Sequence, residues 1–199
     1  AGYDPFQLTG TLGGPLTRIT RTVTQKTKSI AGFGQFTYEF ARGTSLTVGA
    51  RYTSDKRTLD VIDDSNVGVI YAPPRAKANS SAPTWRISLD HRFNDQVMVY
   101  ASYSRGFKSG VFPTAAVATD APAVDPEKID AYEIGLKSQL FDNRIRFNLD
   151  GFYYDYRKIQ FSVYNGASNL LLNAAAAKIY GLDADISASV TDGLTISSS

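Results

Sequence analysis

The sequence predicts an all-β fold, namely an antiparallel β-barrel that crosses a membrane with its strands. Segments of roughly ten residues alternate apolar and polar side chains with a period of two. Tight turns recur about every 50 residues along the chain, and short connections alternate with long ones. Transmembrane barrels are built in this way, from tilted strands of about 9 to 11 residues with short turns at one end and longer loops at the other.

Eight strands are expected from this alternation, and the tight turns between them centre near Gly43, Asn94, Asp142 and Asp192. The expected strands are 30–40, 46–53, 84–93, 97–104, 132–140, 145–153, 180–190 and a last one that opens at Leu194. The seventh segment also fits a helical period over 171–186, with an alanine run at 174–177 that favours a helix. The strand is preferred there because the spacing of the other strands predicts one.

The intervals between these strands are expected to be loops. Residues 1–27 are rich in Gly, Thr and Pro and show no sustained period, so they form a loop before the first strand. The intervals 54–83, 108–128 and 161–173 are predicted as long loops, although residues 67–71 could extend a strand beyond the main sheet. The chain lacks an initiator Met and stops within a predicted strand, which indicates a piece of a longer protein.

The two faces of the predicted strands differ in chemistry. One face is apolar and is expected to contact lipid. Charged residues fall on the other face, as expected for a wet lumen: Arg51, Arg86, Arg92, Glu133, Lys137, Arg146 and Asp150. A soluble antiparallel sandwich would also alternate, but its turns would not sort into short at one end and long at the other. Aromatic residues near strand ends suit an interfacial girdle: Phe40, Tyr52, Trp85, Phe93, Tyr103 and Tyr153.

Composition narrows the possible functions. The chain has 199 residues, 43% of them hydrophobic and 20% charged, with a net charge of +2 from interspersed signs rather than a basic block. This argues against nucleic acid as a partner. Cysteine is absent, so neither disulfides nor thiolate chemistry can contribute. No run of 18 apolar residues exists that could form a transmembrane helix.

Motifs that would indicate catalysis, cofactor binding or metal binding are weak. The segment 106–109 pairs Lys with Ser but lacks the remainder of a phosphate-binding loop, and 64–68 lacks most ligands of a calcium loop. Asp183 and Asp185 share one strand face, where hydration or pairing with an Arg is the simpler interpretation. His91, the single histidine, falls on the apolar face near a short turn. We therefore predict no enzyme activity, no cofactor, no catalytic residue and no metal site.

The stretch from Tyr100 to Gln160 resembles the barrel domain of TonB-dependent receptors. The matching segments are YASYSRGFKSG at 100–110, PEKIDAYEIGLK at 126–137, a turn at 141–144 and an aromatic cluster that precedes Gln160. Residues 29–36, 51–53 and 181–185 also fit that barrel. The resemblance covers about residue 28 to the end.

This resemblance implies a 22-stranded transporter barrel in the outer membrane of a Gram-negative bacterium. Residues 28–199 would form about eight of its strands, and the N-terminal plug domain and the segment that contacts TonB would lie outside the chain. The implied function is TonB-energised import of a scarce nutrient, most often a ferric siderophore or other iron chelate. Implied partners are membrane lipid and lipopolysaccharide, the TonB complex and a small-molecule cargo.

Four residues in the predicted long loops are candidates for contact with an anionic cargo, because loops carry recognition in such scaffolds: Arg75, Lys77, Lys108 and Phe112. Ordinary solvated loop positions are an equally good interpretation of all four. Two alternative functions also stay open: a non-transport outer-membrane barrel that is structural or adhesive, and a soluble β-sandwich binding module.

Overall fold

The computed structural model describes residues 6–10, 19–65, 68–72, 74–113, 123–164 and 169–199. The described residues form strands joined by turns and irregular segments, without a helix. The strands are β1 (Phe6–Gly10), β2 (Ile19–Ala41), β3 (Thr44–Ser65), β4 (Gly68–Tyr71), β5 (Ala76–Arg92), β6 (Val97–Lys108), β7 (Glu127–Leu140), β8 (Ile145–Arg157), β9 (Gln160–Tyr164), β10 (Asn169–Asn173), β11 (Ala176–Thr191) and β12 (Leu194–Ser198). No helix that could span a membrane occurs among the described residues.

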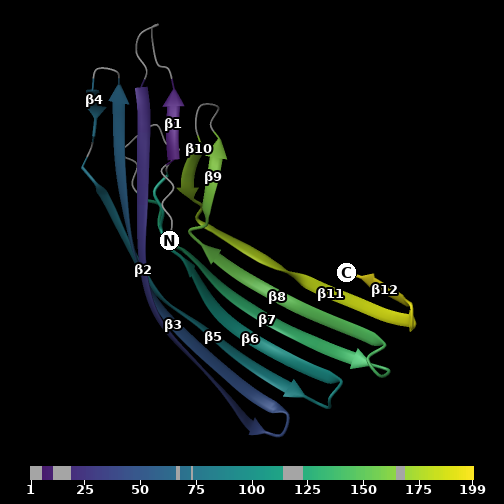
Figure 1. The fold of residues 1–199 in the computed structure, drawn as a ribbon. Helices are drawn as coiled ribbons and strands as arrows, with labels where there is room; N and C mark the ends of the chain where they lie inside the picture. Colours follow the sequence, from purple (N-terminus) through teal and green to yellow (C-terminus); the bar gives the residue numbers. More distant parts are fainter. Residues whose placement is uncertain (1–5, 11–18, 66–67, 73, 114–122, 165–168) are drawn as a thin grey trace.

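A single antiparallel sheet contains most of these strands, in the order β1-β2-β3-β5-β6-β7-β8-β11-β12, with β4 paired to β3. A separate two-stranded sheet joins β9 and β10. Figure 1 shows the large sheet as a curved, open wall in which β1 and β12 are the free edges. The eight predicted strands correspond to β2, β3, β5, β6, β7, β8, β11 and β12, and the predicted all-β antiparallel fold is confirmed.

The short turns lie where the sequence places them. Gly43 has a φ of 73°, and a Cβ there would meet the backbone oxygen of Arg92, so the first turn favours glycine. Asp142 and Asn143 adopt φ values of 54° and 67° in the β7–β8 turn, a conformation that Asp and Asn tolerate better than most residues. All four short turns lie at one end of the wall (Figure 1).

The predicted loops at 1–27, 54–83 and 161–173 need correction. β2 begins at Ile19 and β3 continues to Ser65, so these strands have 23 and 22 residues and extend well beyond a bilayer. β1 lies within 1–27, of which residues 1–5 and 11–18 are outside the described part. β9 and β10 form a hairpin within 161–173, and the helical alternative for 171–186 is wrong because β10 and β11 occupy it.

The extensions were missed for a physical reason. Within the membrane segment the apolar residues of β3 stand at even positions such as Val48 and Tyr52, whereas beyond it Leu59 and Val61 carry the apolar character at odd positions. The apolar side of the sheet therefore changes from one face to the other along a continuous strand, while the odd-numbered face stays the more buried one. Where the apolar residues move from even to odd positions, the period-two alternation is interrupted, and the sequence no longer indicates that the strand continues.

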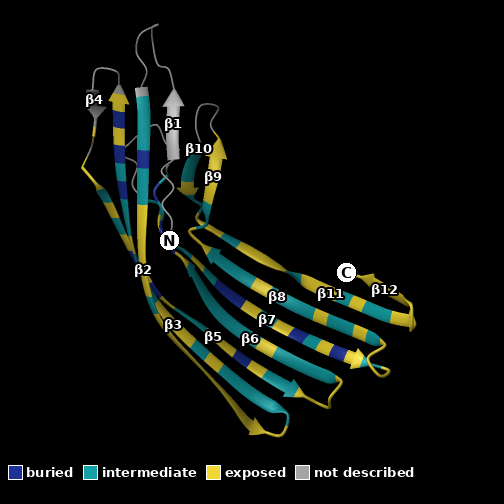
Figure 2. Ribbon diagram, viewed as in Figure 1, coloured by how far each residue is buried: buried dark blue, intermediate teal, exposed yellow. Residues whose placement is uncertain are grey.

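One face of the membrane segment is apolar and open. Strand register places Tyr38, Leu46, Leu89, Ala101, Ile134, Gly151 and Leu182 in one row across seven strands. Ile134 is 66% exposed and Leu182 is 78% exposed, which water would not favour but lipid does. We call this side the lipid face and the opposite side the lumen face. Along β7, exposed and more buried residues alternate in Figure 2.

An aromatic row borders the lipid face on the side of the long connections. Trp85 lies 6.3 Å from Tyr103, Tyr103 stacks on Tyr132 at 4.8 Å, and Tyr153 lies 6.3 Å from Tyr132, measured between ring centroids. Phe93 contacts His91 near the short turns, at a centroid distance of 4.6 Å. Rings at both borders of an apolar band are typical of the two membrane interfaces.

Candidate functional site

The lumen face carries a polar network rather than a catalytic arrangement. The Tyr100 hydroxyl donates a hydrogen bond to the Asp150 carboxylate, and the Tyr154 hydroxyl donates to Glu133 Oε1 at 2.8 Å. Lys137 Nζ lies 5.2 Å from the centre of the Tyr100 ring. These contacts hold carboxylates and a cation in fixed positions along the wall, which makes the lumen face suited to binding polar groups.

Asp185, singled out from the sequence, accepts hydrogen bonds from the Asn148 amide at 2.9 and 3.1 Å. The partner of Asp185 is thus an amide, where the sequence suggested hydration or pairing with an arginine. His91 Nδ1 lies 2.8 Å from the Thr44 hydroxyl oxygen, beside the first short turn. Among the described residues no group of three or more His, Cys, Asp or Glu side chains could hold a metal ion.

The parts of β2 and β3 that extend beyond the membrane, residues 19–29 and 54–65, together with the start of β5, are called the extended wall. The β6–β7 connection packs against the lumen face of this extended wall. Phe112 is 4% exposed and forms an apolar cluster with Val23, Leu59 and Val61 of β2 and β3. Ala76 and Ala78 of β5 pack against the same cluster. This buried cluster explains why the odd positions of β3 become apolar above the membrane segment.

Polar contacts fix the two ends of the same connection. Arg57 Nη2 donates to Ser109 Oγ at 2.8 Å, and the backbone N–H of Gly110 donates to Ser80 Oγ at 3.2 Å. The Gln160 amide donates to the backbone oxygens of Ser109 and Asp125, at 3.1 and 3.0 Å. Gln160 therefore joins the start and the end of the connection, which orders the wall at the entrance to the lumen.

Asn173 completes this arrangement from the other side. Its amide donates to the backbone oxygens of Asp125 and Lys158, at 3.0 and 2.8 Å, and its side-chain oxygen accepts from the Asp125 N–H at 2.7 Å. Lys158 Nζ forms an ion pair with Asp125 at 2.8 Å. The roles of Asn173 and Asp125 were not predicted from the sequence. The one feature that could have indicated this site is Gln160, which follows an aromatic cluster and binds the same Asp125 backbone oxygen as Asn173.

The four predicted cargo residues occupy different environments. Phe112 is in the buried cluster. Arg75 binds Asp60 at 2.6 Å, and strand alternation places Asp60 and Lys77 on the side that continues the lipid face. Lys108 lies on the lumen side, is 60% exposed and pairs with Glu127 at 3.6 Å. The structure therefore does not bring the four residues together, and only Lys108 of the four is both exposed and on the lumen side.

An ion pair stabilises the far end of the extended wall. Arg21 Nε and Nη2 donate to the two Asp63 carboxylate oxygens, each at 2.6 Å. These hydrogen bonds hold the pKa of the Asp63 carboxyl below its ordinary value of 3.8, although burial opposes the shift. A lowered folded-state pKa contributes stability above the ordinary value, and that contribution is lost as the pH falls through the folded-state value.

We expect Asp63→Asn to reduce hydrogen-exchange protection at the ends of β2 and β3 at pH 7 by about tenfold or more, because a partly buried charge-assisted pair is worth roughly 1.5–3 kcal/mol. As the pH falls through the lowered folded-state pKa of Asp63, the wild type should approach the variant, after correction for intrinsic exchange rates. Asp60→Asn, which removes the ion-pair partner of the exposed Arg75, is the matched control and should change little. Equal effects of the two substitutions would contradict this account.

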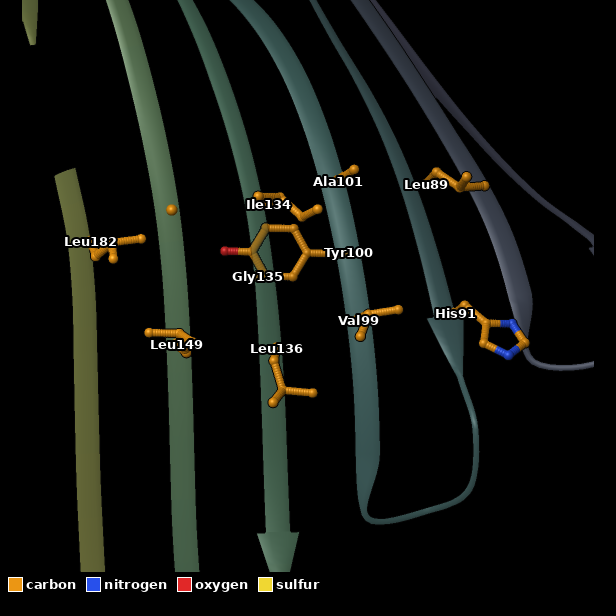
Figure 3. Close-up of a pocket in the computed structure, with 11 residues that line it drawn as sticks. Leu89, His91, Val99, Tyr100, Ala101, Ile134, Gly135, Leu136, Leu149 and Leu182 are labelled. Atoms are coloured by element: carbon orange, nitrogen blue, oxygen red, sulfur yellow. The ribbon is translucent and has the colours of Figure 1, made fainter. Parts of the chain in front are cut away.

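An apolar hollow lies on the lipid face, and Tyr100 and Gly135, which lie on the lumen face, also contribute to its lining (Figure 3). It is a groove of about 500 Å³ lined mainly by aliphatic side chains: Leu89, Val99, Ile134, Leu136, Leu149 and Leu182. Ala101 and Gly151 also line the groove, and their small size leaves space among the larger aliphatic side chains. A groove of this chemistry in a membrane wall accommodates lipid chains, so it is not the site for a polar cargo.

Comparison with known proteins places the fold. A model of the family described as TonB dependent receptor-like, beta-barrel matches residues 1–199. The crystal structure of the ferric yersiniabactin uptake receptor FyuA from Yersinia pestis is similar, with a TM-score of 0.71 at 20% identity, over 91% of this chain and 27% of that one.

Two other solved structures are similar at comparable identity. The closed form of the ferric-catecholate import receptor Fiu from E. coli K12 gives a TM-score of 0.63 at 15% identity, over 87% of this chain and 27% of that one. The copper transporter OprC gives 0.67 at 16% identity, over 94% of this chain and 35% of that one. The chain thus spans about a quarter to a third of the length of the proteins it matches.

Proposed function

Because the chain belongs to the TonB-dependent receptor-like β-barrel family, whose members lie in the outer membrane of Gram-negative bacteria, we propose that it forms part of the wall of a receptor that imports an iron chelate. The cargo would be a ferric siderophore or a related chelate, and import would be energised through TonB. The observation that carries the proposal is the family match, which extends over all 199 residues. The proposed TonB contact and plug domain belong to parts of the receptor beyond this chain.

The names of the matched structures support iron as the cargo metal. FyuA and Fiu are a ferric yersiniabactin uptake receptor and a ferric-catecholate import receptor, whereas OprC is a copper transporter. At 15–20% identity the likeness shows the fold. Copper is therefore the competing cargo that the experiment must separate from iron.

The wall supplies two elements of the proposed mechanism. The first is the set of polar groups held in place on the lumen face of the membrane segment. The second is the β6–β7 connection, which the Gln160 hydrogen bonds fix and which starts beside Lys108, on the lumen side beyond the membrane segment. A cation held at the lumen entrance would attract an anionic chelate and orient it before plug displacement. Lys108 is therefore our proposed cargo contact, whereas Phe112 supports the connection from beneath.

We expect deletion of the full-length receptor to abolish uptake of its labelled ferric chelate under iron limitation. Lys108→Gln should raise the half-saturating chelate concentration several-fold, since one charge-assisted contact is lost, and Lys108→Arg should restore it. Lys178→Gln removes the same charge from the lipid-facing side of β11 and should have no effect. Intact ferric uptake after deletion would overturn the proposal, in favour of copper if copper uptake falls, or of a non-transport barrel if neither changes.

A further inference from the structure

Three cations border a polar hollow on the lumen face, at the end of the wall where the short turns lie. The hollow has a volume of about 290 Å³, and its lining includes Arg92 of β5, Lys137 of β7 and Arg146 of β8. One carboxylate, that of Asp95 in the β5–β6 turn, also belongs to the lining. Because three cations face a single carboxylate, the lining is net positive. We call it the cationic hollow.

Strand register brings the three cations to two neighbouring rows of the lumen face. Arg92 is the partner of Met98, and Met98 is the partner of Lys137, so these three residues lie in one row. Arg146 is the partner of Gln139, which lies two residues along β7 from Lys137. Adjacent strands lie about 4.8 Å apart and successive residues on one face about 7 Å. Long Arg and Lys side chains at these positions can therefore reach one common anion.

The three cations have no carboxylate partner. All three residues are exposed, and within the part of the chain that the structure describes none of them forms an ion pair. Carboxylates at adjoining positions of the lumen face accept hydrogen bonds from uncharged donors instead: Asp90 from Ser88, Asp150 from Tyr100 and Asp185 from Asn148. The cations are thus available to an external anion, although the neighbouring negative charges weaken its binding.

The cationic hollow and Lys108 lie at opposite ends of the lumen face. Asp95 and Gln96, which line the hollow, belong to the β5–β6 turn, and short turns face the periplasm in outer-membrane barrels (Figure 1). Lys108 lies on the side of the long connections, beyond the membrane segment. An anion that enters beside Lys108 would therefore meet the second group of cations where it leaves the lumen.

The properties of the hollow suit a brief stop rather than tight capture. Passage through a pore requires sites that are strong enough to be occupied and weak enough to be vacated. Exposed charge contacts are weak, and the adjoining carboxylates weaken these further. The volume of about 290 Å³ lies near the lower end of the roughly 300–1,000 Å³ typical of small-molecule sites. The hollow therefore accommodates an anionic part of a chelate rather than the whole molecule.

We infer that the cationic hollow is an exit site for the cargo. Arg92, Lys137 and Arg146 hold an oxygen anion of the chelate, such as a carboxylate, while the chelate passes from the lumen to the periplasm. The inference rests on the proposed import of an anionic chelate. It assigns different steps to two groups of cations, since Lys108 acts in capture and the cationic hollow acts in release.

The test measures uptake by cells that carry the full-length receptor. The probe is a radioiron-labelled, carboxylate-bearing siderophore whose uptake is lost when the receptor is deleted. Lys137→Gln/Arg146→Gln should lower the maximal uptake rate at least about threefold, because two exposed charge contacts with the departing anion are lost. Equilibrium binding of the probe to de-energised cells should be unchanged, and the half-saturating concentration should not rise. Lys108→Gln should show the opposite pattern, with weaker binding and a maximal rate near that of the wild type.

Two control variants separate a local charge effect from other causes. Lys137→Arg/Arg146→Lys keeps both charges in the cationic hollow and should keep the wild-type rate. Arg42→Gln/Arg144→Gln makes the same change in net charge at two short turns, outside the lining of the hollow, and should leave the rate unchanged. Heat-modifiable migration on gels checks that each variant folds. If the glutamine variant of the hollow fails to fold, Arg146→Gln alone should lower the maximal rate about twofold.

An unchanged maximal rate in the glutamine variant of the hollow, an equal loss in the short-turn control, or weaker binding to de-energised cells would overturn the inference. Entry of a bulky antibiotic through the glutamine variant would also overturn it, because the cations would then hold the plug rather than pass cargo. Failure of the proposed function looks different. In that case deletion of the receptor leaves uptake of every ferric chelate intact, whereas loss of uptake on deletion together with a wild-type rate in the variant refutes the exit site alone.

Discussion

Replacement of Gly135 by alanine is expected to destabilise the barrel strongly, although the change adds a single methyl group. In the register Gly135 lies between Tyr100 of β6 and Asp150 of β8. The Tyr100 ring passes over Gly135 to reach the Asp150 carboxylate with its hydroxyl, as Figure 3 shows for the ring and the glycine. A Cβ at Gly135 would overlap both the ring and the carboxylate, so one of them must move.

Overpacking costs roughly 1–3 kcal/mol, and loss of a hydrogen bond to a charged group costs roughly 1.5–3 kcal/mol. We therefore expect Gly135→Ala to lower the free energy of unfolding by about 3 kcal/mol or more, measured by urea unfolding of the full-length receptor in detergent. Gly34→Ala is the matched control, because a Cβ at Gly34 would meet nothing within 4 Å. That variant should be as stable as the wild type or slightly more stable.

A double-mutant cycle separates the steric cause from a general intolerance of glycine replacement. In a Tyr100→Ala background the ring is absent, so Gly135→Ala should cost clearly less than it does in the wild type. Equal costs in both backgrounds would show that the ring does not determine the need for glycine. Equal stability of Gly135→Ala and Gly34→Ala would contradict the account altogether.

The sequence was sufficient for the membrane segment of the fold. In strands such as β7, lipid on one side and a wet lumen on the other impose a strict alternation, and Asp142-Asn143 marks the adjoining turn. Alternation also separates the lumen-face residues Glu133 and Lys137 from Tyr132 and Ile134. The sequence of each strand therefore indicates by itself which residues face lipid and which face the lumen.

The extended wall and the candidate site could not be predicted in this way, because their character depends on contacts between distant segments. Val23, Leu59 and Val61 are buried because Phe112, from another part of the chain, covers them. In isolation those strands look like polar loop, and Phe112 looks like an exposed loop residue. The same holds for Gln160, whose two acceptors lie 51 and 35 residues away in the sequence.

Phe112→Ala is expected to release the β6–β7 connection from the wall while leaving the membrane segment intact. Phe112 is 4% exposed, and truncation of a buried phenylalanine costs about 3–5 kcal/mol. The cluster lies beyond the apolar band, so this cost should appear as local opening rather than as global unfolding. Hydrogen exchange of the full-length receptor should be at least about tenfold faster in residues 108–113 and 123–126 and at Val23, Leu59 and Val61.

Phe161→Ala provides the control for loss of a ring near the same end of the barrel, because Phe161 is 40% exposed on β9 and should leave the exchange rates of the β6–β7 connection unchanged. The pair of variants also decides between two roles for Phe112. If the side chain contacted cargo directly, Phe112→Ala would weaken chelate uptake without changing exchange in the ligand-free receptor. If it supports the connection from beneath, exchange must rise before any cargo is added, and uptake should fall only because Lys108 is no longer held at the lumen entrance.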